Sequence, residues 1–286
     1  MWPVTAMVDA DGVGCERRVG VKQQLVIETR SLRHSYGGVQ AVRGLDIGVA
    51  AGEMVGLIGP NGAGKSTVIE CISGSVRGFS GSVLLYGTDI SRWPMHRIAR
   101  AGLLRTYQIP RLFRRLSVIS NLMLAAEQGT VETMSSTLLG RWRARDAERL
   151  SQCLDVLQRF GLLGIADNAA SDLSGGQERL VELCRILLMR PKVVLLDEPF
   201  AGVSPENRYR LAEAIDELRA AGSTLLMVEH RLEWVERLCE RVVVMAQGQQ
   251  IAAGVMDDIR GNKEVIESYL GTKSHSRPSA SKGARA

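Results

Sequence analysis

Nine residues of this chain, Gly59-Pro60-Asn61-Gly62-Ala63-Gly64-Lys65-Ser66-Thr67, have the types and spacing needed to bind a phosphate chain. They match the pattern G-x-x-x-x-G-K-[ST], and we call them the phosphate loop. The glycines accept backbone dihedrals that let main-chain amides surround an anion, while Lys65 would reach the β- and γ-phosphates. Ser66 would offer its hydroxyl to Mg²⁺. The apolar residues Met54–Ile58 predict a strand before the loop, and Ser66–Ile72 predict a helix after it. The sequence therefore predicts nucleotide binding.

A second segment suited to anion binding lies much later, at Leu173-Ser174-Gly175-Gly176-Gln177. Ser174 and Gln177 have the S-x-x-Q spacing of a capping box, which predicts that a helix begins here and continues through residues 178–189. The two glycines leave the start of this helix open to close approach by an anion. Alone, the phrase is an ordinary helix start, so its meaning depends on the segments around it.

Two acidic residues follow the next predicted strand. The apolar run Val193–Leu196 predicts a buried parallel strand, and Asp197-Glu198 come directly after it. Parallel sheets bind ligands beyond the carboxyl ends of their strands, so both carboxylates would lie at such a site. Asp197 suits Mg²⁺, and Glu198 suits a base that orients or deprotonates an attacking water.

In this order, the three motifs resemble the ATP-binding cassette (ABC) ATPase family over about residues 24–271. Tyr36 lies where the family has an aromatic residue that stacks on adenine, and Gln108 where it has a glutamine that contacts Mg²⁺ and water. His230 ends the predicted strand Thr224–Val228, where the family has a switch histidine that contacts the γ-phosphate. Each of these three matches is weak alone, and the resemblance gives them meaning.

The resemblance implies ATP and Mg²⁺ as cofactors and assigns roles to residues of this chain. The implied catalytic residues are Glu198, His230 and Gln108. The implied Mg²⁺ ligands are Ser66, Gln108 and Asp197. Tyr36 and residues 59–67 would bind the nucleotide, and Ser174, Gly175, Gly176 and Gln177 of a second cassette would cap the γ-phosphate from across a dimer interface. Residues Ala201–Pro205 would form the loop that crosses that interface.

The implied fold is α/β: a P-loop NTPase core with a parallel sheet, an N-terminal antiparallel β portion and an inserted α-helical subdomain. Residues 25–271 would form this ABC ATPase domain, with the helical subdomain at about residues 110–175. A flexible leader, residues 1–24, would precede it, and a disordered basic tail, residues 272–286, would follow it.

The sequence pattern predicts further elements within that domain. Short strands are expected at Leu25–Glu28, Leu45–Val49 and Ser82–Leu85. In the helical insertion, four apolar residues recur at i, i+3, i+4 and i+7, which predicts one amphipathic face. These residues are Leu150, Cys153, Leu154 and Leu157. Helix and strand alternate after Ser174, with a helix over residues 205–221 and a strand over residues 241–245, which indicates a parallel sheet.

Particular segments of the sequence narrow the resemblance to the importers of branched-chain amino acids and the related importers of urea and amides. The segments that carry it are Leu104–Phe113, Ser117–Leu122 and Arg241–Gly248. Three positions depart from the subfamily pattern. Gly175 stands where an aromatic residue is frequent, Ser204 where Asp or Asn is usual, and Arg231 where Asp is common. The departures leave the ATP chemistry intact and the exact transporter open.

The expected function is therefore that of an ATP-hydrolysing subunit that powers a separate membrane permease, with branched-chain amino acids or a related amide or urea as cargo. Its expected partners are a second ABC ATPase subunit, identical or not, the permease subunits and, indirectly, a solute-binding protein. The alternatives are an ATPase of another ABC system, such as lipid or lipopolysaccharide export, and a soluble ABC protein outside transport.

Composition and charge limit the location of the protein. No uninterrupted apolar run approaches the roughly 20 residues that span a bilayer, and the first residues lack the order of a secretory signal. The net charge is +5, and four of the excess positive charges lie in the tail, at Lys273, Arg277, Lys282 and Arg285. The remainder lacks the broad basic surface of a nucleic-acid-binding protein. We expect a protein held by the permease at the cytoplasmic face of the inner (plasma) membrane, without a nucleic-acid partner.

Overall fold

The computed structural model describes residues 24–128 and 142–271. Its strands are β1 (Leu25–Tyr36), β2 (Val39–Leu45), β3 (Gly48–Ala50), β4 (Met54–Ile58), β5 (Ser80–Leu85), β6 (Thr88–Asp89), β7 (Leu103–Arg105), β8 (Val193–Asp197), β9 (Thr224–Val228), β10 (Arg241–Ala246) and β11 (Gln249–Gly254). Its α-helices are α1 (Lys65–Ile72), α2 (Met95–Arg100), α3 (Val118–Gln128), α5 (Trp142–Arg159), α6 (Gly175–Met189), α7 (Pro205–Ala220), α8 (Leu232–Leu238), α9 (Met256–Arg260) and α10 (Lys263–Gly271).

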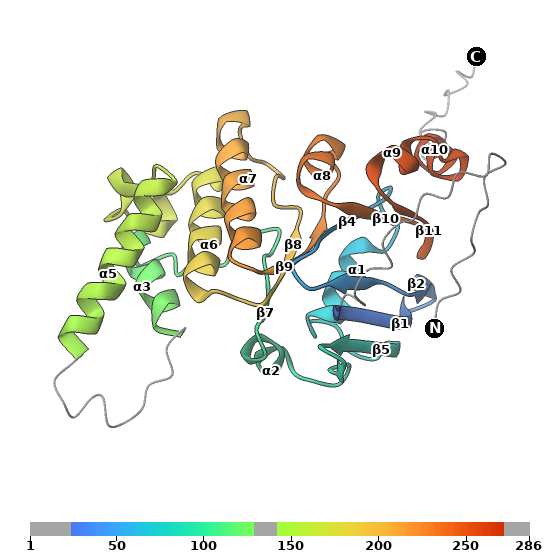
Figure 1. The fold of residues 1–286 in the computed structure, drawn as a ribbon, viewed down its shortest axis with the longest axis horizontal. Coiled ribbons are helices and arrows are strands. Elements are labelled where there is room, and N and C mark those ends of the chain that lie inside the picture. Colours follow the sequence, from blue (N-terminus) through green and yellow to red (C-terminus); the bar gives the residue numbers. More distant parts are fainter. Residues whose placement is uncertain (1–23, 129–141, 272–286) are drawn as a thin grey trace, which may run out of the picture.

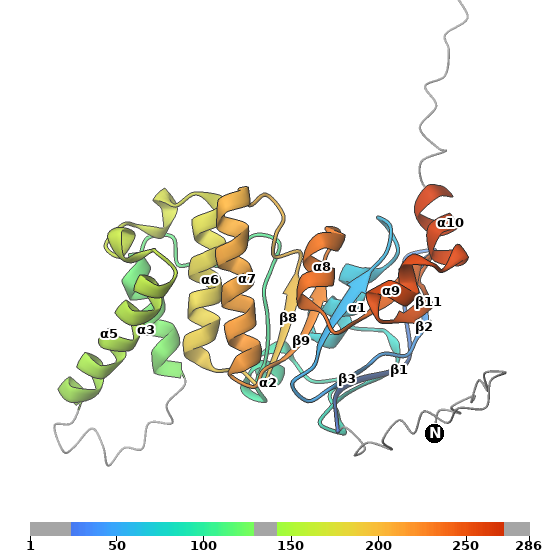
Figure 2. The same cartoon turned by 45° about the horizontal axis from the view of Figure 1, so that its top comes forward.

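Two sheets build the molecule. Six strands form one sheet in the order β11-β10-β4-β9-β8-β7, in which β11 is antiparallel to β10 and the other pairs are parallel. The second sheet is antiparallel, with the order β2-β1-β5-β6 and β3 paired to β1. Helices α3 and α5 lie at one end of the molecule and the antiparallel sheet lies toward the other (Figures 1 and 2). The predicted mixed α/β fold class is confirmed.

The central strands are buried on both faces, and alternation along each strand separates two cores. Met54 and Ile58 of β4 pack into the core shared with α3, α5, α6, α7 and α8. Val55 and Leu57 of the same strand pack into the core shared with α1 and the antiparallel sheet. Because side chains alternate across a strand, a run of apolar residues serves both cores at once. Helix α1 is thereby fixed between the two sheets with the phosphate loop at its start.

Several predicted elements are found close to their predicted bounds: β4, α1, β8 and β9. The strand predicted at Leu45–Val49 is wrong, because β2 ends at Leu45 and β3 begins at Gly48. The Thr29 side chain of β1 explains the break: its hydroxyl donates to the Leu45 carbonyl and accepts from the Ile47 amide, both at 2.9 Å. The first predicted strand, in contrast, continues to Tyr36.

The insertion contains α3 and α5, followed by two short 3₁₀ turns at Leu163–Ile165 and Ala170–Asp172. The predicted apolar face of α5 is partly wrong, since Leu150 is 41% exposed. The buried face begins one turn later, with Cys153, Val156, Leu157 and Phe160. The predicted tail, all but the last residue of the predicted leader, and residues 129–141 of the insertion lie outside the described residues.

Candidate functional site

The phosphate loop has a backbone that only glycine can adopt at two of its positions. Gly59 has a φ of 149° and Gly64 a φ of 99°. A Cβ at Gly59 would lie 2.1 Å from the Met245 carbonyl oxygen, and one at Gly64 would lie 2.2 Å from the Ala41 carbonyl oxygen. Backbone atoms cannot yield to such contacts. The loop therefore requires glycine at these two positions, because main-chain atoms of β2 and β10 pack directly against it.

Lys65 begins α1, and its ammonium group bends back over the loop. Its Nζ donates to the carbonyl oxygens of Gly59 and Pro60, each at 2.9 Å. Burial lowers the pKa of Lys65, while the nearby Glu198 carboxylate acts in the opposite direction. The side chain thus places a partly desolvated positive charge at the phosphate loop, where it suits a phosphate group.

A cavity of about 420 Å³ joins the phosphate loop to three residues that are distant in sequence. Tyr36, Glu198 and His230 line it together with residues 61–67 and Ala41. Strands β8 and β9 are neighbours in the sheet, so Glu198 and His230 leave the same edge. The Nε2 of His230 lies 2.9 Å from the Oε1 of Glu198. Glu198 has a φ of 48°, a left-handed conformation that a glutamate adopts only when its surroundings impose it.

Tyr36 stands at the tip of the β1–β2 hairpin, with 49% of its surface exposed. Its hydroxyl lies 2.9 Å from the Oε2 of Glu70 in α1, and its ring meets the ring of His34 edge-on, at 4.6 Å between centroids. These contacts hold the ring at the rim of the cavity, beside the start of α1.

A neighbouring cavity of about 430 Å³ gathers the three predicted Mg²⁺ ligands, Ser66, Gln108 and Asp197. Asp197 is buried: its Oδ2 accepts from Arg105 at 2.8 Å, and its Oδ1 is buried without a hydrogen-bond partner. Burial raises the pKa of Asp197, while Arg105 opposes that rise. A hydroxyl, an amide oxygen and an unpartnered carboxylate oxygen are hard oxygen donors, which fit Mg²⁺.

Arg105 is a residue of this site that the sequence did not reveal. Its side chain is 8% exposed, and its two terminal nitrogens reach Asp197 and the hydroxyls of Ser73 and Ser75, the latter at 3.3 and 3.2 Å. Only the pairing of β7 with β8 brings this guanidinium to the Asp197 carboxylate. It holds one oxygen of the Asp197 carboxylate and leaves Oδ1 available to a ligand, as the outer partners of metal ligands do.

The predicted capping box at the start of α6 is confirmed. The amide of Gln177 donates to the Ser174 hydroxyl at 3.4 Å, and the amide of Ser174 donates to the Gln177 side chain at 2.9 Å. Residues 174–177 line neither of the two cavities described above. The structure thus gathers all the predicted site residues outside this segment, apart from Gly59 and Pro60, whose carbonyls bind Lys65.

Helix α6 also grips the segment that contains Gln108. Arg179 donates to the carbonyl oxygens of Tyr107 (2.7 Å) and Gln108. One turn later, Glu182 accepts from the amide of Arg111 at 3.4 Å, and Arg185 donates to the Arg111 carbonyl oxygen at 2.7 Å. The spacing of three residues puts these charged side chains on one stripe of the helix, which we call the α6 clasp (Arg179, Glu182 and Arg185). The helix itself was predicted from the sequence, but the partner of this stripe was not.

The α6 clasp makes a prediction about pH. Burial raises the pKa of Glu182 from its ordinary value to about 7, so the folded chain holds this proton more tightly than the unfolded chain. The free energy of unfolding should therefore fall as the pH rises toward 7, and the contribution of Glu182 should be lost above it. The free energy of unfolding of Glu182→Gln, relative to that of the wild type, should therefore increase from pH 5 to pH 8 by on the order of 3 kcal/mol. Urea unfolding at pH 5 and at pH 8 measures this difference, with Glu213→Gln at an exposed position as control. An equal difference between Glu182→Gln and the wild type at the two pH values would contradict the prediction.

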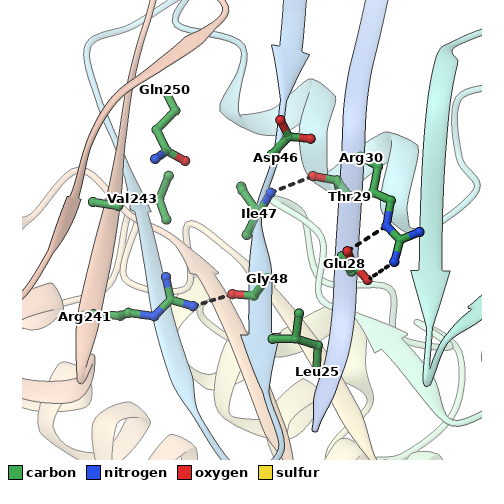
Figure 3. Close-up of a pocket in the computed structure, with 11 residues that line it drawn as sticks. Leu25, Glu28, Thr29, Arg30, Asp46, Ile47, Gly48, Arg241, Val243 and Gln250 are labelled. Carbon is green, nitrogen blue, oxygen red and sulfur yellow. Dashed lines mark hydrogen bonds and ion pairs between the residues drawn. The ribbon is translucent and has the colours of Figure 1, made fainter. Parts of the chain in front are cut away.

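A larger cavity of about 730 Å³ lies elsewhere, between β1 and β3 on one side and β10 and β11 on the other (Figure 3). Its charged side chains are already engaged: Arg30 with Glu28, and Arg241 with Glu53 and the carbonyl oxygen of Gly48. None of the site residues predicted from the sequence lines it. Size alone therefore does not identify the reactive site of this molecule.

Within the described ranges, residues 24–128 and 142–271, no helix is long and apolar enough to cross a membrane. A protein-family model described as "ABC transporter" matches residues 42–201. The chain is 37% identical over 248 residues to the probable branched-chain amino acid transport ATP-binding protein LivG of Archaeoglobus fulgidus, covering 87% of this chain and 96% of the relative. It is 38% identical over 251 residues to the high-affinity branched-chain amino acid transport ATP-binding protein LivG of Escherichia coli K12, covering 87% and 98%.

Solved structures of ATP-binding cassettes are also similar to this chain. The ADP conformation of MJ1267, an ATP-binding cassette of an ABC transporter, matches with a TM-score of 0.72 and 32% identity, covering 86% of this chain and 99% of the other. A nucleotide-free ATP-binding cassette matches with a TM-score of 0.72 and 31% identity, covering 86% and 98%.

Proposed function

Because this chain belongs to the ABC transporter family and is one of its ATPases, we propose that it powers a separate membrane permease by binding and hydrolysing ATP between two cassettes. The family resemblance drawn from the sequence is confirmed, as is the ABC ATPase fold. The observation that best supports the proposed mechanism is the meeting of Lys65, Glu198 and His230 in the phosphate-loop cavity.

In this mechanism, the phosphate loop and Lys65 bind the triphosphate, and Tyr36 stacks on the adenine ring. Glu198 takes or orients the proton of the attacking water, while His230 holds the Glu198 carboxylate and faces the γ-phosphate. Ser66, Gln108 and Asp197 would hold Mg²⁺, whose charge would offset that of the phosphates. Gln108 lies between this metal site and the α6 clasp, so it can report occupancy of the site to the helical insertion.

A second copy or a related subunit completes the pocket. The start of α6 carries the amides of Gly175 and Gly176 and the Ser174 hydroxyl, and these groups lie outside both cavities of their own chain. They would bind the γ-phosphate held by the partner. ATP binding then closes the dimer, and hydrolysis opens it, because the nucleotide contacts both subunits only in the closed state.

Variants of the α6 start test the shared pocket. A Cβ at the exposed Gly175 would meet no atom of its own chain within 4 Å, so Ser174→Ala combined with Gly175→Val removes the hydroxyl and adds bulk at the open start of α6. We expect steady-state ATP hydrolysis to fall about 100-fold or more, in the range of lost transition-state contacts. Because these residues act on the partner's nucleotide, the affinity of the isolated monomer for ATP should be unchanged. Hydrolysis at the wild-type rate would contradict the proposal.

For the cargo, we propose branched-chain amino acids or a related small amide or urea. The support is the identity of 37–38% to the two LivG proteins over nearly their whole length. The test is to purify the full chain with its membrane subunits, reconstitute them in liposomes and supply ATP on the side of this subunit. Uptake of labelled leucine, isoleucine, valine, urea or a small amide is the expected result; movement of lipid without solute uptake would identify another ABC system.

A further inference from the structure

Glu229 is a buried carboxylate that the mechanism above does not use. It directly follows β9 and precedes His230, and it is 2% exposed. None of the ion pairs found among residues 24–128 and 142–271 includes it. Three main-chain amides donate to it instead: His230 at 2.8 Å and Arg231 at 3.1 Å to Oε1, and Phe200 at 3.3 Å to Oε2. A buried carboxylate needs such donors, and here they come from two different loops.

These two loops carry the two reacting side chains. Phe200 lies two residues after Glu198, in the loop that follows β8, while His230 and Arg231 belong to the loop that follows β9. The last main-chain bond between these segments is that of the Glu198 amide to the Val228 carbonyl oxygen, at 2.9 Å. Beyond this point the strands separate, and the Glu229 carboxylate bridges the loops.

Apolar packing reinforces the same bridge. Phe200 is fully buried and stacks on Trp234 of α8, at 4.6 Å between ring centroids and an interplanar angle of 14°. The loop after β8 is therefore fixed to the helix that follows His230. The stack sets the distance between the two loops, and the Glu229 carboxylate sets their register, because hydrogen bonds are directional.

We propose that Glu229 is a positioning residue that holds Glu198 and His230 at their separation of 2.9 Å. This inference rests on the roles proposed for those two residues. A carboxylate is required because both of its oxygens accept. In Glu229→Gln one oxygen remains for two amides, and the NH₂ group would face the Phe200 amide, donor against donor. The loop after β8 then loses its register relative to His230.

The experiment uses the full chain and compares Glu229→Gln with Glu53→Gln. Glu53 is the control: its carboxylate accepts from a main-chain amide, that of Ala50 at 2.8 Å, pairs with Arg241, and lies at the opposite end of β4 from the site. We expect Glu229→Gln to lower kcat about 10- to 100-fold, the range expected for a small misplacement of reacting groups. The Kd for ATP should change less than about twofold, because the phosphate loop is untouched, and Glu53→Gln should keep the wild-type kcat.

The outcomes separate this inference from the proposed function. If kcat of Glu229→Gln equals that of Glu53→Gln after correction for the folded fraction, Glu229 is only structural and the inference is overturned. Glu198→Gln is measured beside them. If Glu198→Gln is inactive while Glu229→Gln is normal, the inference alone fails; if Glu198→Gln hydrolyses ATP normally, the role of Glu198 in the proposed function fails.

Hydrogen exchange of the wild-type chain keeps the inference testable if Glu229→Gln does not fold. The amides of Phe200, His230 and Arg231 leave the sheet ladder and are expected to be protected through Glu229. Exchange of the Phe200 amide at the rate of an exposed loop would show that the bridge does not form in solution and would overturn the inference.

Discussion

Glu198→Gln is expected to lower kcat for ATP hydrolysis by about 10³-fold while leaving the Kd for ATP within about threefold of the wild type. Glutamine has the same shape and can keep a hydrogen bond to His230, which lies 2.9 Å away, but it cannot accept a proton from water. Binding depends on the phosphate loop and Lys65, which this change leaves in place. Steady-state hydrolysis checks the expected kcat, and equilibrium binding of the nucleotide to the same preparation checks the expected Kd.

Glu213→Gln is the control for that result, because Glu213 is an exposed glutamate of α7, away from the phosphate loop. It should hydrolyse ATP at the wild-type rate. If Glu198→Gln also did so with the permease present, Glu198 would not be the base, and another group near the γ-phosphate would have to activate the water.

Lys65→Ala has the second large expected effect, a loss of affinity for ATP of about 100-fold or more. Burial lowers the pKa of the Lys65 ammonium group, which donates to the carbonyl oxygens of Gly59 and Pro60. A buried cation next to phosphate contributes more than an exposed one, because little solvent screens it. Isothermal titration with ATP and Mg²⁺ measures the loss.

Lys192→Ala is the matched control, since Lys192 lies just before β8, at the far end of that strand from Glu198, and its ammonium contacts only the ring of Tyr86 among the described cation–ring pairs. Its affinity for ATP should equal that of the wild type. An equal loss in both variants would mean that overall charge, and not the position of Lys65, governs binding.

The parts of this molecule that sequence predicts well are those governed by local physics. The glycines of the phosphate loop, the capping box of Ser174 and Gln177, and the apolar runs of β4, β8 and β9 each follow from nearest neighbours along the chain. The alternation of helix and strand predicted a parallel sheet, and the pairing of β8 with β9 that the structure adds brings Glu198 to His230.

The residues that sequence did not reveal act across the fold. Arg105 acquires its role when β7 pairs with β8, and Glu229 when the loops after β8 and β9 meet. Periodicity gives the face of a helix but not its partner, so the α6 clasp was invisible as well. The break between β2 and β3 has the same origin, because the Thr29 hydroxyl that causes it comes from another strand.

The α6 clasp holds its partner segment by main-chain atoms, which has a consequence for how such a subunit adapts. The path of the segment depends on carbonyl and amide groups that every residue except proline provides. A side chain that projects from it, such as Ile109 at 77% exposure, is thereby left free to vary. An ATPase subunit of this kind can therefore adapt to a different permease by exchanging exposed side chains of this segment, while the main-chain hydrogen bonds to α6 stay the same.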